Sequence, residues 1–169
     1  MSDAWIPACR DRISLNALGS WMTFRLRQAR ITDLPAIYRG EQDYIRCWEP
    51  DHEATWRAQL ERHLTRWVDN FERMTVACVG EQVAGYSLWM PEDGKAQLCT
   101  INVSGEHRRC GIGRALIDAY AMDAARQGFS VLALSVRPDN PARILYERAG
   151  FVCVGAGAHD YLRYERHVW

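Results

Sequence analysis

The run from Gly105 to Tyr120, GEHRRCGIGRALIDAY, constrains the fold most, because it places a charged glycine turn directly before an apolar helical pattern. The turn and the first helical turn contain three arginines and two glycines, which are Arg108, Arg109, Arg114, Gly111 and Gly113. The amino end of a helix already carries partial positive charge from its aligned peptide dipoles and unpaired N–H groups. Additional cations are unfavourable there unless something negative binds in the turn. The sequence therefore predicts an anion-binding turn that opens a helix.

Strand and helix patterns extend on both sides of this turn. Residues 75–103 read as three antiparallel strands, because short apolar runs are separated by turn residues at 81–82 and 93–94. Gly128 ends the helix that starts near Gly113, and Asn140-Pro141 opens another. Further strands are expected at 22–30, 130–136, 151–156 and 161–168, and helices at 32–48 and 51–71. The expected fold is α/β (α+β), a mixed and mostly antiparallel sheet of about seven strands with four helices on both faces, in the order β-α-α-β-β-β-α-β-α-β-β.

Composition excludes several classes of protein. The chain has 169 residues, which predicts one domain, and we expect residues 1–21 to be an appendage to a domain at 22–169. Lys+Arg and Asp+Glu are equal at 21 each, which argues against a nucleic-acid or membrane-surface binder. No pair of the six cysteines forms C-x-x-C and the histidines show no metal spacing, so no metal is expected. Cysteine usage favours a cytoplasmic location, and Cys78, Cys99 and Cys153 are predicted to lie in the core.

Three phosphate-loop motifs compete for the turn. A Walker A loop is rejected because Arg114 and Ala115 stand where lysine and a hydroxyl are required. A dinucleotide fingerprint lacks its third glycine, since Leu116 fills that place. The remaining motif, R-x-x-G-x-G from Arg108 to Gly113, resembles the pyrophosphate loop of the GNAT superfamily of N-acetyltransferases. A second stretch supports the resemblance, because LALSVRPDNPARILYERAGF at 132–151 is similar to the other signature of that superfamily.

The resemblance implies that acetyl-CoA is the acyl donor. In that superfamily the backbone at the end of the third antiparallel strand lies along the pantetheine, and the turn surrounds the pyrophosphate. One arginine could instead reach the ribose 3′-phosphate. The implied cofactor-binding residues are Ile101, Asn102, Val103, Arg108, Arg109, Cys110, Gly111, Ile112, Gly113, Arg114 and Asn140.

The resemblance also implies direct attack of an amine on the thioester. Tyr146 stands where the superfamily has a tyrosine that protonates the leaving thiolate, although its helical position also suits a core tyrosine. The usual general base is missing. The two positions at which members of the superfamily carry a catalytic glutamate are Gln97 and Ser135 here, and neither side chain takes up a proton.

Residues 40–53, GEQDYIRCWEPDHE, are a candidate acceptor site because they combine five acids with one base, Arg46, and with aromatic residues. Carboxylates there attract a cationic amine, and aromatic rings pack on its apolar part. The predicted acceptor-binding residues are Glu41, Asp43, Tyr44 and Trp48. A small-molecule amine is the first choice of acceptor. The alternatives are a protein N-terminus or lysine, a non-catalytic acyl-CoA-binding module and, more distantly, a nucleotide-binding oxidoreductase. A homodimer is compatible with the sequence.

Overall fold

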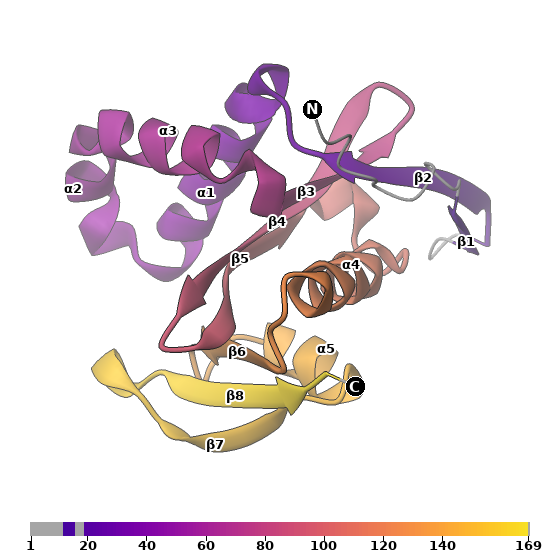
Figure 1. Ribbon diagram of the computed structural model, residues 1–169. Coiled ribbons are helices and arrows are strands. Elements are labelled where there is room, and N and C mark those ends of the chain that lie inside the picture. The colour runs from indigo at the N-terminus through magenta and orange to yellow at the C-terminus, as the bar shows by residue number, and fades with distance from the viewer. Residues whose placement is uncertain (1–11, 16–18, 169) are drawn as a thin grey trace, which may run out of the picture.

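The computed structural model describes residues 12–15 and 19–168 of the chain (Figure 1). Its strands form one sheet in the order β1-β2-β3-β4-β5-β6-β8-β7, in which only β5 and β6 run parallel. Their bounds are β1 Arg12–Leu15, β2 Trp21–Gln28, β3 Met74–Val79, β4 Gln82–Glu92, β5 Lys95–Val103, β6 Val131–Val136, β7 Val152–Ala156 and β8 Leu162–His167. The predicted mixed, mostly antiparallel sheet is thereby confirmed.

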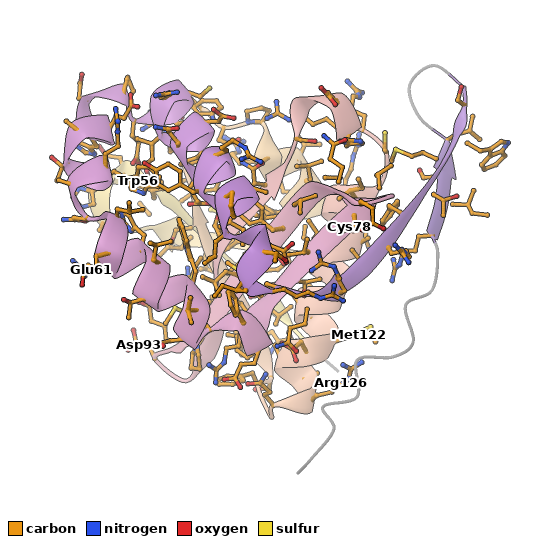
Figure 2. The ribbon with its side chains drawn as sticks, turned by 90° about the horizontal axis from the view of Figure 1, so that it is seen from above. Trp56, Glu61, Cys78, Asp93, Met122 and Arg126 are labelled. Carbon is orange, nitrogen blue, oxygen red and sulfur yellow. The ribbon has the colours of Figure 1, made fainter. Side chains whose placement is uncertain are left out.

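The described helices lie in two layers, one on each face of the sheet (Figure 1). Their bounds are α1 Leu34–Trp48, α2 Glu53–Ala58, α3 Leu60–Asp69, α4 Ile112–Arg126 and α5 Ala142–Arg148. The single helix expected at 51–71 is divided, because Gln59 leaves helical geometry at φ −99° and ψ 22°. Figure 2 labels Trp56 and Glu61 in the α1–α3 layer, and Met122 and Arg126 on α4.

The amino-terminal part of the sheet differs in detail from the prediction. An additional edge strand, β1, pairs antiparallel with β2 from Arg12–Phe24 to Leu15–Trp21. Residues 1–11 and 16–18 of the expected appendage lie outside the described residues. The domain boundary at Met22 therefore stays a prediction, although strand pairing already begins upstream of it.

Side-chain alternation assigns each face of the sheet to one helical layer. Met74, Val76 and Leu88 are buried against Ile37 of α1 and Trp67 of α3. The opposite face packs on α4 and α5, and its buried side chains include Trp89, Leu98, Ile117, Tyr120, Leu132 and Leu134. These two cores hold the helices in place on both sides of β5 and β6.

Strands β5 and β6 separate half-way along their length. They pair from Ala96–Leu132 to Leu98–Leu134 and no further, while β5 continues along β4 as far as Val103. The separation coincides with a bulge at Cys99, an extra residue between the β4–β5 pairs Trp89–Leu98 and Leu88–Thr100. A bulge bends its own strand and interrupts the ladder. The free edges of β5 and β6 beyond this point therefore flank an opening in the sheet.

Candidate active site

The predicted anion-binding turn lies at the end of β5 and opens α4. Gly111 precedes the helix with φ +79°, in the left-handed region that favours glycine. Arg109 is also left-handed at φ +60°. The first intrahelical hydrogen bond runs from the N–H of Ala115 to the carbonyl of Gly111 at 3.0 Å, which leaves the N–H groups of residues 112–114 without helical partners. This arrangement can bind an anion through backbone N–H groups and the helix dipole.

The three arginines of the turn have different environments. Arg108 donates from Nε to the carbonyl of Val103 at 3.1 Å. Arg114 donates to Asp118 Oδ1 and to the carbonyl of Arg148, both at 3.1 Å. Arg109 is exposed and makes no side-chain hydrogen bond or ion pair with any described residue. Arg109 is therefore the cation of the turn that can meet an anion without breaking a contact.

Other predicted cofactor residues contribute through backbone or through packing. Cys110 and Ile112 are buried, so only their backbone groups can face a ligand. Gly113 brings α4 close to α5, because an added Cβ would lie 3.0 Å from Leu145 Cδ2. Asn140 lies just before α5, and its Oδ1 accepts a hydrogen bond from the N–H of Ala142, the first residue of the helix, at 2.9 Å.

The β5 residues Ile101, Asn102 and Val103 lie beyond the last β5–β6 pair. Ile101 and Val103 pack toward α4. Asn102 faces α1, where its Nδ2 donates to the carbonyl of Gly40 at 3.2 Å. The β5 backbone facing β6 is therefore free at the opening, where a chain-like ligand could hydrogen-bond to it.

Tyr146 of α5 is 7% exposed and packs against Phe151 at a centroid distance of 6.2 Å. Both sequence-based interpretations of Tyr146 agree with this position, because the ring belongs to the core but the hydroxyl has no hydrogen bond with any described residue. Burial raises the pKa of Tyr146, and Tyr44 adds to that increase. The hydroxyl thus stays protonated, as a proton donor requires.

The acceptor-side residues that the sequence predicts are only partly brought together. Glu41 is half-buried and hydrogen-bonded to β4 and β5. Burial raises the pKa of Tyr44 to about 12, with further contributions from Tyr161 and Glu49. Asp43 is exposed without a hydrogen bond or ion pair to the described part of the chain, and Trp48 is half-buried at the end of α1.

The sequence did not predict a hydrogen-bonded bridge, Tyr161 to Glu49, that crosses the acceptor side. Tyr161, in the turn before β8, donates a hydrogen bond to Glu49 at the end of α1. Arg137, directly after β6, interacts with Tyr161 and holds Asp139 through a 3.0 Å contact. The turn also contains His159 and Asp160 at φ +56° and +61°. These residues are far apart in sequence, and only the acidity around Glu49 gave a signal.

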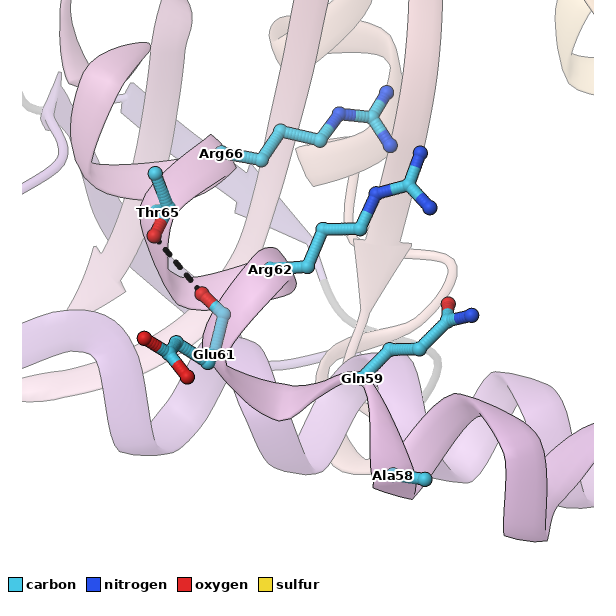
Figure 3. Close-up of a pocket in the computed structure, with 6 residues that line it drawn as sticks. All are labelled: Ala58, Gln59, Glu61, Arg62, Thr65 and Arg66. Atoms are coloured by element: carbon cyan, nitrogen blue, oxygen red, sulfur yellow. Dashed lines mark hydrogen bonds between the residues drawn. The ribbon is translucent and has the colours of Figure 1, made fainter.

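A hollow of about 660 Å³ is lined by residues of α2 and α3 and by Gln59 between them (Figure 3). Figure 3 shows Gln59, Arg62 and Arg66 on one side of the helix and Glu61 on the other. Nε of Arg66 approaches Met90 Sδ at 3.5 Å. One helical stretch forms the whole lining, and none of the predicted site residues belongs to it.

Residues 12–15 and 19–168 contain no cluster of three or more His, Cys, Asp or Glu side chains that could hold a metal ion. No helix in the same ranges is long and apolar enough to cross a membrane.

The cysteines of the described ranges, Cys47, Cys78, Cys99, Cys110 and Cys153, are free. Cys78 is buried as predicted, but Cys99 and Cys153 are exposed. Cys99 occupies the bulge and Cys153 an edge strand, so the prediction that both lie in the core is wrong.

Several known proteins are similar to this chain in sequence. N-acetyltransferase family 8 member 3 of Mus musculus is 30% identical over 129 residues, which is 75% of this chain but only 56% of that protein. The [ribosomal protein bS18]-alanine N-acetyltransferase of Escherichia coli (strain K12) is 33% identical over 122 residues, covering 71% of this chain and 75% of that protein.

Solved structures of other proteins show the same fold as this chain. The PaiA N-acetyltransferase of Thermoplasma acidophilum, in complex with coenzyme A, superposes with a TM-score of 0.74 at 16% identity, covering 86% of this chain and 99% of that one. Residues 36–151 match the acetyltransferase (GNAT) family, a segment that includes the anion-binding turn, the opening and Tyr146. The chain therefore belongs to the acetyltransferase (GNAT) family.

Proposed function

We propose that the protein transfers the acetyl group of acetyl-CoA to the primary amine of a small molecule, by direct attack in a ternary complex. The observation that carries this proposal is the opening between β5 and β6, which begins at Cys99 and is followed, at the end of β5, by the anion-binding turn. A thioester laid along the free edge of β5 with its pyrophosphate at the turn has its reactive end near the opening.

Different residues bind the pyrophosphate, stabilise the oxyanion and donate the proton. Backbone N–H groups at Gly111–Gly113 and the side chain of Arg109 hold the pyrophosphate. The N–H of Val103 stabilises the oxyanion that forms on the acetyl carbonyl. Tyr146 donates the proton that the thiolate leaving group requires, since its hydroxyl has no competing hydrogen bond among the described residues. Glu41, Tyr44 and Trp48 line the acceptor side, and Asp43 adds negative charge near it.

The bridge from Tyr161 to Glu49 favours a small acceptor. It joins the turn before β8 to the end of α1 and so narrows the approach to the opening. A protein N-terminus or lysine is the second candidate, favoured by the 33% identity to the bacterial bS18-alanine N-acetyltransferase. A cytoplasmic location and a homodimer stay predictions.

A thiol-release assay with acetyl-CoA tests the proposal against amino acids, polyamines, aminoglycosides and short peptides, including a peptide with an N-terminal alanine. We expect release with at least one small amine, and mass spectrometry should find the product heavier by one acetyl group. Release with peptides alone would favour the second candidate. Acetyl-CoA binding without release, over the whole panel and up to alkaline pH, would identify a non-catalytic acyl-CoA-binding module.

A further inference from the structure

Glu41 is held rigidly over β5 by neighbours from two strands. Its Oε1 accepts hydrogen bonds from the hydroxyl of Tyr86 at 2.8 Å and from Oγ1 of Thr100 at 2.7 Å. Gly40 makes the first contact possible, because a Cβ at that position would overlap the Tyr86 hydroxyl. Glycine is unfavourable inside a helix, so its presence in α1 indicates that this close approach matters.

The second carboxylate oxygen of Glu41 has a different environment. No described residue hydrogen-bonds to Oε2, although the side chain is half-buried. Among the described residues, Arg73 Nε is the fully buried side-chain nitrogen or oxygen without a hydrogen bond, so the unpaired Oε2 is accessible to water. Oε1 therefore anchors the carboxylate, and Oε2 is left for a water molecule or a ligand.

Glu41 also lies on the correct face of the sheet to replace the missing bases. Leu98 and Leu134 point into the α4 core, so the alternate residues Gln97 and Ser135 face the α1 side. Thr100 faces the same side, since it hydrogen-bonds to Glu41 of α1. Thr100 directly follows the bulge at which β5 and β6 separate. The anchored carboxylate thus approaches the opening from the face on which the usual glutamates would stand.

The surroundings of Glu41 favour proton uptake. Burial raises the pKa of Glu41, while the hydrogen bonds from Thr100 and Tyr86 and electrostatic interactions with Arg66 and His63 on α3 oppose the increase. Tyr44 on α1 and Cys99 on β5 are further titratable neighbours whose pKa Glu41 raises. A carboxylate with a raised pKa is a stronger base that still ionises.

We propose that Glu41 accepts the proton of the attacking amine, which makes it the general base of the transfer; the inference rests on the proposed function. The acceptor ammonium gives one proton to Oε2, directly or through one water, and its neutral nitrogen attacks the acetyl carbon. The new N–C bond forms and the C–S bond breaks. The thiolate takes a proton from Tyr146, which recovers the proton that the new amide nitrogen loses. Tyr86 and Thr100 are positioning residues that fix the carboxylate.

The test compares Glu41→Gln with Glu81→Gln, the same exchange at an exposed carboxylate in the turn between β3 and β4. We expect Glu41→Gln to lower kcat by about 10²–10⁴-fold near neutral pH and to leave the acetyl-CoA Kd within about twofold. Glu81→Gln should keep kcat within about threefold. Wild-type turnover with an unchanged Glu41→Gln pH profile would overturn the inference and leave the proposed function intact. Absence of thiol release by the wild type would overturn both.

Variants of the two positioning residues test the role of Glu41 through the pH dependence of kcat, which a purely structural role of these residues would leave unchanged. Tyr86→Phe and Thr100→Val each remove a donor that stabilises the ionised carboxylate, so the pKa of Glu41 rises further. Because the base acts only when ionised, the acid limb of the kcat profile should move to higher pH in both variants. The matched control is Tyr120→Phe, which removes a tyrosine hydroxyl that bonds to the backbone carbonyls of Ala96 and Ala133 in the other core. If both variants lose thermal stability but keep the wild-type acid limb, Glu41 is not the base.

Discussion

The donor and acceptor sides of the opening are built in different ways. The donor side is one short run, residues 101–114, and presents mainly backbone groups, because Cys110 and Ile112 are buried and Arg108 and Arg114 bond to the protein. The acceptor side presents side chains from α1, β4, β5, β6, α5 and the turn before β8, linked by hydrogen bonds such as Tyr161–Glu49. A backbone cradle tolerates many side chains but few backbone conformations, whereas the acceptor side depends on the individual side chains.

Apart from the Glu41 variant, Tyr146→Phe should produce the largest effect, because it removes the hydroxyl at the junction of the two sides. We expect kcat to fall by about 10²-fold or more while the acetyl-CoA Kd and the melting temperature barely change. The hydroxyl has no hydrogen bond with the described residues, so its loss breaks no structural contact. Steady-state kinetics and calorimetric titration measure these quantities. An unchanged kcat would remove Tyr146 from the mechanism.

Arg109→Gln and Arg114→Gln separate ligand charge from structural charge within the turn. Arg109 has no side-chain hydrogen bond or ion pair in the described ranges, so its loss should weaken acetyl-CoA binding by about tenfold, less at high salt. Arg114 bonds to Asp118 and to the carbonyl of Arg148, so its replacement should lower the melting temperature and alter the Kd by less than about threefold. Equal effects of the two variants on the Kd would show that both arginines bind the ligand.

Gly111→Ala and Gly128→Ala place the same strain at the two ends of α4. Their φ angles are +79° and +90°, and an added Cβ at Gly128 meets nothing within 4 Å. Each variant should lower the free energy of unfolding by about 1–2 kcal/mol. Only Gly111→Ala should also weaken acetyl-CoA binding, by about three- to tenfold, because it distorts the N–H groups of the cradle. A matching loss of affinity in Gly128→Ala would mean that general destabilisation explains both results.

Tyr161→Phe should have the smallest effect and concerns the acceptor side alone. It removes the hydrogen bond to Glu49, which is partly exposed, so we expect the KM of the acceptor to change by about two- to fivefold. The acetyl-CoA Kd should stay constant, since the donor turn does not contact Tyr161. A change in acetyl-CoA affinity as large as the change in KM would contradict the division into two sides.

The difference between the donor and acceptor sides explains which features could be predicted from the sequence. The donor turn depends on local rules, since left-handed glycine, a helix amino terminus and a preceding strand all fall within residues 101–114, and its elements were predicted correctly. Tyr146 was predicted as a site residue from a similarly short motif, and its role stays a prediction. The hydrogen bonds that connect Glu41 to Tyr86 and Thr100 span 45 and 59 residues, so no local pattern could have revealed them.

Other differences also come from tertiary packing. The break at Gln59 lies within a continuous apolar periodicity, so it could not be read from the pattern of residues 51–71. Cys99 looked like a core residue because it stands in an apolar run, yet the bulge turns it out of the core. Asp43 belongs to the acidic stretch but stays in solvent, because a helix presents neighbouring residues in different directions.

The bulge at Cys99 means that the opening depends on the number of residues in β5 as well as on their side chains. An ordinary scan of substitutions would keep the extra residue in place and would find this position unremarkable, since its side chain is exposed. Deleting the one codon would retain Glu41, Tyr146 and the whole turn, yet would let β5 resume regular pairing toward β6. Insertions and deletions in this strand, rather than exchanges of side chains, are therefore the changes to which the protein should be least tolerant.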